Sequence, residues 1–153
     1  MSLEERINYD LKEFLKSGKS FETGVLRMVF SVFQNKKIEK RGKGQAPELF
    51  DEEAVEILLR EAKKRKEASE IYIRGGREDL SKKEIQELEV IKKYLPEQIG
   101  EKEVEIMVIE AIKKLSAKNE KDFGKVMAEL MKELRGKADA SLVSNLVKRH
   151  LLG

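Results

Sequence analysis

Residues 123–147 read FGKVMAELMKELRGKADASLVSNLV. Apolar side chains recur at intervals of three and four residues in its first half, which predicts an amphipathic helix over residues 123–134. Gly136 is placed to end that helix, and Asp139 to cap a second helix that follows directly. The apolar face of this second helix consists of Leu142, Val143, Leu146, Val147 and Leu151. The stretch therefore predicts two consecutive helices joined by a short turn.

The second of these helices contains no acidic residue after Asp139, although 40% of the chain is charged. The absence of acidic residues has two possible explanations. The helix could belong to the packed core, or it could present a surface to a negatively charged partner. Lys148 and Arg149 would lie at the C-terminal end of the helix, where cations stabilise its dipole without any ligand. The sequence thus leaves both explanations open for different sides of the same helix.

A third amphipathic run, over residues 104–115, precedes this pair. Short connections between three such helices predict a compact three-helix bundle over residues 101–153. Upstream, Ser2 and Glu5 have the spacing of a capping box, so a first helix should cover about residues 3–17. Residues 25–33 are apolar on nearly every side, which indicates a second helix enclosed by its neighbours.

Residues 41–49 lose the helical periodicity and should form an exposed loop. Asp51 is then placed to cap a long third helix that ends at Gly75 and Gly76. Ser81 and Glu84 repeat the capping-box spacing and should open a fourth helix.

Pro96 should close the fourth helix, because the residue before a proline is pushed out of helical geometry. The predicted fold is therefore all-α. A helical domain of about four helices covers residues 1–95, a linker covers residues 96–100, and the bundle covers residues 101–153. With two prolines, ten glycines and no tryptophan, the composition also favours helices over strands.

The amino-acid composition excludes several classes of function. The chain has no cysteine, which excludes disulfides, thiolate catalysis and cysteine-ligated metal centres. The most apolar window, residues 25–33, is too short to span a bilayer, and the N-terminus does not read as a secretory signal. We therefore expect a cytoplasmic protein without a membrane partner, and the dense mixed charge suggests a thermophilic source.

Catalytic and metal-binding patterns are also scarce. His150 is the one histidine, and we expect it to be structural or on the surface. We predict no catalytic residue, and we expect no metal or cofactor. Arg27 stands inside the apolar window, and a buried guanidinium must be paired, so we expect a structural ion pair with an acid of the turn Glu78–Asp79.

Four short motifs point to a family: LR at 26–27, KKRKEA at 63–68, GGREDL at 75–80 and YLPEQ at 94–98. Together they resemble the YqeY family, small bacterial proteins related to the tail of the amidotransferase subunit GatB. The resemblance runs over essentially the whole chain. It implies an N-terminal helical unit joined to a bundle like the GatB tail.

The stretch 123–147 resembles the closing motif of GatB, the subunit of the tRNA-dependent amidotransferase that engages tRNA. Asp139 stands where the GatB tail usually has Asn, and both residues can cap a helix. The GatB body, which uses ATP and magnesium, has no counterpart in the 153 residues. The remaining motif positions carried over are Gly124, Met127, Gly136, Ala138 and Leu146.

The resemblance implies an accessory protein near tRNA, without amidotransferase activity by itself. Two groups of basic residues are candidates for binding RNA phosphates, and the alternative is that they form a solvated lysine-rich surface without a ligand. The first lies in the bundle and comprises Lys125, Lys132, Arg135, Lys137, Lys148 and Arg149. The second flanks the predicted loop and comprises Lys36, Lys37, Lys40, Arg41 and Lys43.

Two alternatives stay open. The chain could be an adaptor that binds a protein, such as an amidotransferase or synthetase component, through helix faces and without RNA. It could also associate by homology with the glutamine-dependent carbon–nitrogen ligases, as a subunit whose active site forms with a partner.

Overall fold

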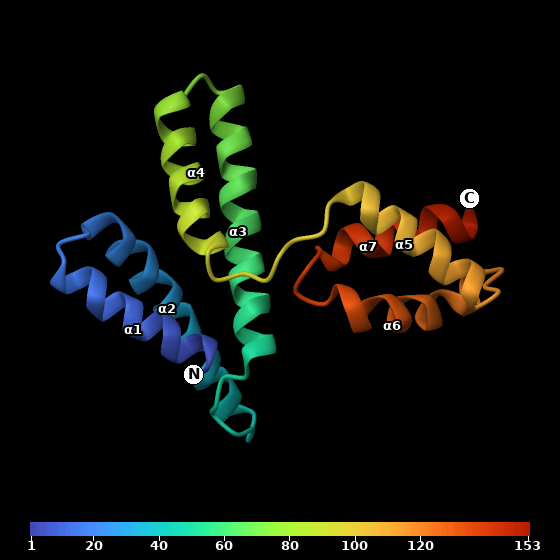
Figure 1. Ribbon diagram of the computed structural model, residues 1–153, viewed down its shortest axis with the longest axis horizontal. Coiled ribbons are helices and arrows are strands. Elements are labelled where there is room, and N and C mark those ends of the chain that lie inside the picture. Colours follow the sequence, from blue (N-terminus) through green and yellow to red (C-terminus); the bar gives the residue numbers. More distant parts are fainter. The chain divides into compact units, whose positions relative to one another are not determined.

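The computed structural model describes residues 1–153 and is all-α, as predicted. The chain divides into two compact units, residues 1–95 and 96–153 (Figure 1). The first unit contains four helices: α1 (Leu3–Lys16), α2 (Ser20–Gly42), α3 (Asp51–Arg74) and α4 (Glu78–Lys92). The second contains α5 (Glu101–Lys114), the short 3-10 helix η1 (Glu120–Asp122), α6 (Phe123–Leu134) and α7 (Ala140–Leu152).

The capping box at the start of α1 forms as predicted. The Ser2 hydroxyl accepts the Glu5 N–H at 3.1 Å, and the Glu5 carboxylate accepts the Ser2 N–H at 2.9 Å. The predicted cap of α3 is wrong, because Phe50 occupies that position and its N–H donates to Glu53 Oε1 at 3.1 Å. Asp51 instead accepts the N–H of Leu3 at 2.9 Å. Its carboxylate therefore satisfies a backbone donor in the first turn of α1 and ties the start of α3 to it.

Two other predicted boundaries differ from the structure. The loop was predicted over residues 41–49, but helix α2 continues to Gly42, so the loop begins at residue 43. Helix α4 begins at Glu78, not at Ser81, because Gly76 turns the chain with a φ of +73°. Ser81 therefore lies inside the helix, buried, and its hydroxyl has no hydrogen-bond partner.

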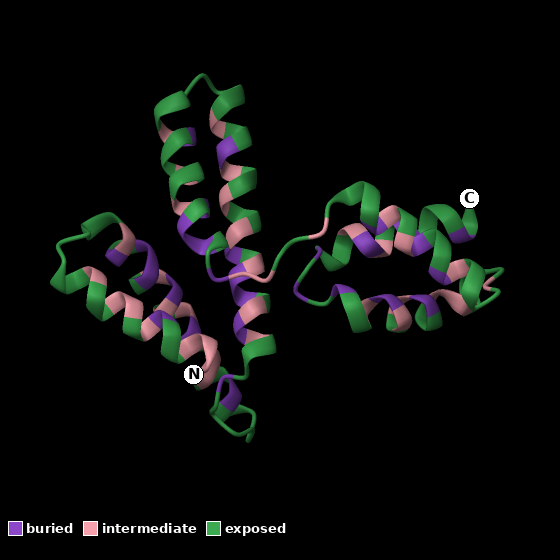
Figure 2. Ribbon diagram, viewed as in Figure 1, coloured by how far each residue is buried: buried purple, intermediate pink, exposed green.

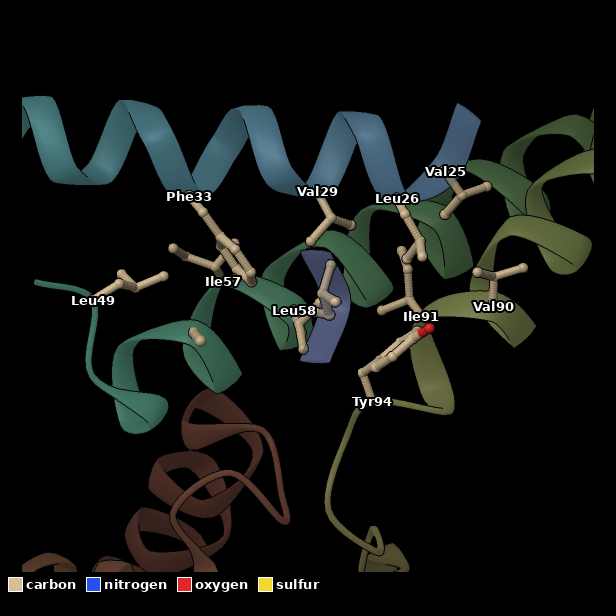
Figure 3. Packing of buried hydrophobic residues seen from close by; sticks show 12 residues of the cluster. Val25, Leu26, Val29, Phe33, Leu49, Ile57, Leu58, Val90, Ile91 and Tyr94 are labelled. Carbon is tan, nitrogen blue, oxygen red and sulfur yellow. The ribbon is translucent and has the colours of Figure 1, made fainter. Parts of the chain in front are cut away.

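The core of the first unit lies between α2, α3 and the end of α4, with Ile7 contributed by α1 (Figure 3). Leu26, Val29 and Phe33 of the apolar α2 are fully buried, which matches the prediction of an enclosed helix. Each such side chain contributes about 1.5–3 kcal/mol through the apolar surface that it removes from water. This core holds α2 and the α3–α4 hairpin in fixed register.

The second unit is a three-helix bundle in which each of α5, α6 and α7 contacts the other two. Helix α6 has the predicted bounds, and Gly136 follows it with a φ of +79°. Asp139 caps α7, since its Oδ1 accepts the Ser141 N–H at 3.1 Å. Buried residues from all three helices form one hydrophobic cluster, and exposed residues alternate with them along each helix (Figure 2).

Residues 96–100 are hydrogen-bonded to the bundle. The Ile99 N–H donates to the carbonyl of Lys137 at 2.8 Å, and Gln98 Nε2 donates to the carbonyl of Gly136, also at 2.8 Å. The segment that the sequence presents as a linker is thus held against the turn between α6 and α7.

Candidate functional site

All six residues of the first candidate group, the basic residues of the bundle, are exposed. We call this group the bundle basic surface. Lys125 and Lys132 are two turns apart on α6, so they share a side of the helix about 10 Å apart. Two further members lie in the turn before α7, and two in its last turns. The six residues are Lys125, Lys132, Arg135, Lys137, Lys148 and Arg149.

Lys148 is positioned by an aromatic ring. Its Nζ lies 5.7 Å from the ring centroid of Phe123, the first residue of α6. A cation over a ring face at this distance is attracted by about 0.5–1 kcal/mol at an exposed site. The contact brings Lys148 to the end of α6 that carries Lys125.

Acidic residues lie beside some of these cations, and Glu129 makes the closest contacts. Glu129 of α6 contacts Lys132 at 3.2 Å and Lys114 of α5 at 3.0 Å. The hydrogen bond from Lys114, followed by the one from Lys132, lowers the pKa of Glu129. Both lysine side chains stay at least 70% exposed, and exposed pairs of this kind contribute little to stability. Lys132 can therefore exchange Glu129 for a phosphate at small cost.

Helix α7 has no acidic residue of its own, and α5 supplies one. Glu105 Oε1 lies 2.8 Å from His150 Nε2 at the surface of the bundle. His150 therefore joins α7 to α5.

The second candidate group lies at the end of α2, and internal acids hold most of it. Lys40 is only 5% exposed, and its ammonium donates to the carbonyl of Glu48 and to Glu53 Oε1. The hydrogen bond from Lys40 lowers the pKa of the Glu53 carboxyl. Lys40 also lies 4.6 Å from the ring centroid of Phe50, so it fastens the segment between α2 and α3 and is not available to a ligand.

The other lysines of this group are also paired. Lys37 contacts Glu4 of α1, whereas Lys36 and Lys43 both contact Glu39, at 3.6 and 2.9 Å. Hydrogen bonding from Lys43 lowers the pKa of Glu39. Arg41 is exposed and forms no ion pair. The structure brings the five residues to one end of α2 but leaves Arg41 as the single unpaired cation there.

The predicted ion pair of Arg27 does not form. Arg27 lies on the exposed side of α2, and Asp79 pairs with Arg77 at 3.2 Å. The prediction treated the apolar window as buried all round, whereas the helix presents the Arg27 position to solvent.

Similarity to known proteins extends over almost the whole chain. The family model for Yqey-like proteins matches residues 4–151. The chain belongs to the YqeY-like family. It is also 40% identical, over 67 residues, to a glutamyl-tRNA(Gln) amidotransferase subunit of Sulfurisphaera tokodaii. That match covers 41% of this chain and 10% of the relative, so the chain spans a small part of the relative's length. It supports the relationship to amidotransferase subunits that the sequence indicates.

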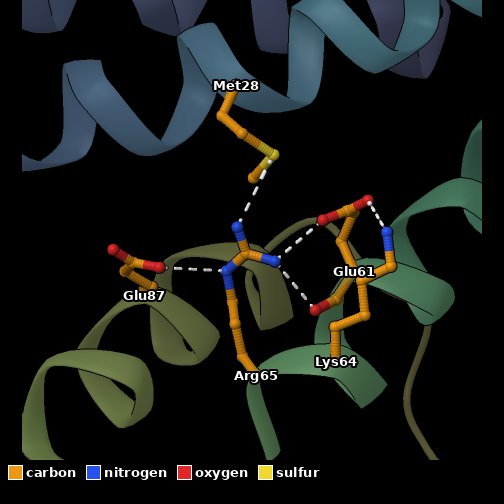
Figure 4. A network of polar contacts seen from close by, with 5 residues as sticks. All are labelled: Met28, Glu61, Lys64, Arg65 and Glu87. Atoms are coloured by element: carbon orange, nitrogen blue, oxygen red, sulfur yellow. Dashed lines mark hydrogen bonds and ion pairs between the residues drawn. The ribbon is translucent and has the colours of Figure 1, made fainter. Parts of the chain in front are cut away.

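Residues of the YqeY motifs hold the fold together. Arg65, from KKRKEA, donates through Nη1 to the carbonyl and the carboxylate of Glu61, both at 2.9 Å. Its Nε donates to Glu87 of α4 at 3.2 Å, and its Nη2 lies 3.5 Å from the sulfur of Met28 in α2 (Figure 4). One guanidinium therefore connects three helices. Sequence reasoning missed it because the motif reads as a solvated charge run.

Residues of the YLPEQ motif also connect separate elements of the fold. Its Tyr94 hydroxyl donates to Asp10 of α1 at 2.6 Å, and the Arg6 guanidinium lies 5.0 Å from the centre of the tyrosine ring. Its Gln98 binds the turn after α6 through the carbonyl of Gly136. This motif fastens α4 to α1 and residues 96–100 to the bundle.

Membrane spans and metal clusters are both absent from the structure. None of the helices combines the length with the apolar content that crossing a membrane requires. No three acidic or histidine side chains come together in a way that could hold a metal ion.

Proposed function

We propose that this YqeY-like protein binds tRNA through the bundle basic surface and acts as an accessory protein in an amidotransferase context. The observation that carries the proposal is the uneven charge of the second unit. Residues 111–153 contain ten basic and five acidic residues, whereas residues 96–110 contain one and five. The six candidate cations of the basic part are all exposed.

The expected contacts are to the RNA backbone. Phe123 is the one Phe, Tyr or Trp between Pro96 and Gly153, and it is half-buried beside Lys148, while the imidazole of His150 is held by Glu105. The bundle therefore offers no free ring on which an unpaired base could stack. Exposed lysines and arginines bind phosphates instead, so recognition should follow the shape of the RNA and weaken as salt rises.

The relationship to amidotransferase subunits supports tRNA as the RNA in question. The relative from Sulfurisphaera tokodaii is named for glutamyl-tRNA(Gln), and the proposal extends that substrate to this chain. The alternative of a protein adaptor without RNA predicts no affinity for tRNA.

A titration of labelled tRNA with the full chain, read by fluorescence anisotropy, tests the proposal. We expect saturable binding at about 50 mM salt that weakens at least tenfold at about 200 mM. Reversal of Lys132, Arg135, Lys137, Lys148 and Arg149 to Glu should abolish it. The matched control reverses five exposed cations of the first unit, Lys12, Arg60, Lys66, Arg74 and Lys83, and should leave most of the affinity. Equal losses in both variants, or no binding at low salt, would contradict the proposal.

A further inference from the structure

The first unit has a shallow, open groove between α2 and α4. Its apolar lining consists of Phe21 from the first turn of α2, with Ile85 and Val90 from α4. Phe21 is 37% exposed and Ile85 is 42% exposed, so both present apolar surface to solvent. Below the groove the two helices are packed together, as Val25 and Val90 show (Figure 3). The groove therefore has a packed, apolar floor.

The polar residues that line this groove are acidic or neutral. They are Glu22 of α2, together with Gln86 and Glu89 of α4. Glu89 lies 3.6 Å from Lys92, in an exposed i, i+3 pair that a stronger partner can displace. Glu22 forms no ion pair within the chain. An apolar floor between two carboxylates repels RNA and suits a ligand that is both apolar and cationic.

We propose that this groove docks a basic amphipathic helix of a partner protein. Large apolar side chains of that helix, spaced three or four residues apart, would cover Phe21 and Ile85. Lysine or arginine side chains beside them would meet Glu22 and Glu89. Exposed aromatic residues are frequent anchors of protein interfaces, and acids at the rim select partners by charge.

The test uses two designed 16-residue helical peptides with the same leucine face. The first carries Lys beside the leucines and the second carries Glu at the same positions. Amide NMR of the isotope-labelled full chain is recorded during each titration. We expect saturable shifts around Phe21, Glu22, Ile85 and Glu89 with the Lys peptide and none there with the Glu peptide.

Charge exchange makes the test specific. The double reversal Glu22→Lys and Glu89→Lys should weaken the Lys peptide about tenfold and create binding of the Glu peptide. The control reversal, Glu97→Lys with Glu110→Lys in the second unit, should change neither affinity. Binding that ignores the reversal, or shifts that map elsewhere, would overturn the proposal.

Two further measurements exclude other occupants and a folding defect. Phe21→Ser and Ile85→Ser should each lower the affinity for the Lys peptide while the circular dichroism spectrum and tRNA binding stay unchanged. Failure of this proposal is therefore distinct from failure of the tRNA proposal. If sedimentation shows a dimer that either substitution dissociates, the groove is an interface between copies of this chain, and the proposal is wrong.

Discussion

Lys40 is a buried residue at the end of α2, and its ammonium is bonded to the Glu48 carbonyl and to Glu53. In sequence it is one of several lysines near the end of α2, and its neighbours Lys36, Lys37 and Lys43 form the surface pairs that such a run usually forms. The difference follows from position on the helix. At residue 40 the side chain points toward the segment that leads into α3.

Lys40→Ala should therefore lower the free energy of unfolding by about 2–3 kcal/mol, because it leaves the carboxylate of Glu53 and a carbonyl without their partner. Urea denaturation measures the loss. Lys43→Ala is the matched control, since its pair with Glu39 is exposed, and it should cost less than about 0.5 kcal/mol. Equal effects of the two substitutions would contradict the role assigned to Lys40.

Tyr94 predicts how the free energy of unfolding depends on pH. Burial, and then the hydrogen bond to Asp10, raise its pKa well above the ordinary value of 10.0. The unfolded chain releases this proton near pH 10 while the folded chain retains it, so the free energy of unfolding falls as pH rises above that value and is unaffected well below it.

Unfolding by urea at pH 8 and at about pH 10.5 should therefore show a larger loss of stability in the wild type than in Tyr94→Phe, which lacks the ionisable group. Tyr9→Phe removes an exposed tyrosine instead and should behave as the wild type does. If the wild type and Tyr94→Phe lose stability in parallel, the hydroxyl does not contribute in this way.

At the scale of the element, the turn between α6 and α7 depends on one backbone conformation. Gly136 has a φ of +79°, where a Cβ is strained, so Gly136→Ala should destabilise the chain by about 1–2 kcal/mol. Gly124 lies in the first turn of α6, where an added Cβ meets nothing within 4 Å. Gly124→Ala should raise stability by about 0.5 kcal/mol through better helix propensity. Thermal unfolding of the two variants should shift in opposite directions, and a shift in the same direction would refute the assignment.

Helix boundaries could be predicted where sequence and packing agree. The bounds of α6 follow from its regular apolar spacing and from Gly136, and those of α1 from its capping box. The extension of α2 to Gly42 could not be predicted, because residues 36–42 have no apolar period. They stay helical since lysine and arginine are good helix formers and Lys40 is held from outside the helix.

The start of α4 was missed for a different reason. Ser81 and Glu84 imitate a capping box, but the helix already begins where Gly76 turns the chain. In the candidate site, the exposure of Lys125, Lys132, Lys148 and Arg149 followed from their helix positions. Their ion pairs, and the contacts of Arg65 with three helices, depend on which helices pack against each other. The spacing of residues in the sequence does not predict such contacts.

At the scale of the whole molecule, each unit has a hydrophobic core of its own. Leu134→Ala removes a fully buried side chain from the bundle and should cost about 3 kcal/mol there. Amide hydrogen exchange of the full chain should show faster exchange in α5, α6 and α7 and unchanged exchange in α2, α3 and α4. Leu58→Ala, equally buried in the first unit, should produce the reverse pattern. Uniform acceleration in either variant would mean that the two cores unfold together.

The assignment of tRNA binding to the bundle is tested most directly by an NMR titration of the isotope-labelled full chain with tRNA. We expect the amide signals of Lys125, Lys132, Arg135, Lys137, Lys148 and Arg149, and of their immediate neighbours, to shift or broaden first at about 50 mM salt and to recover as salt is raised. The signals around Lys36 to Lys43 should stay in place, because internal acids hold most of those lysines. Perturbation centred on residues 36–43, or no perturbation of the bundle at low salt, would contradict the proposal.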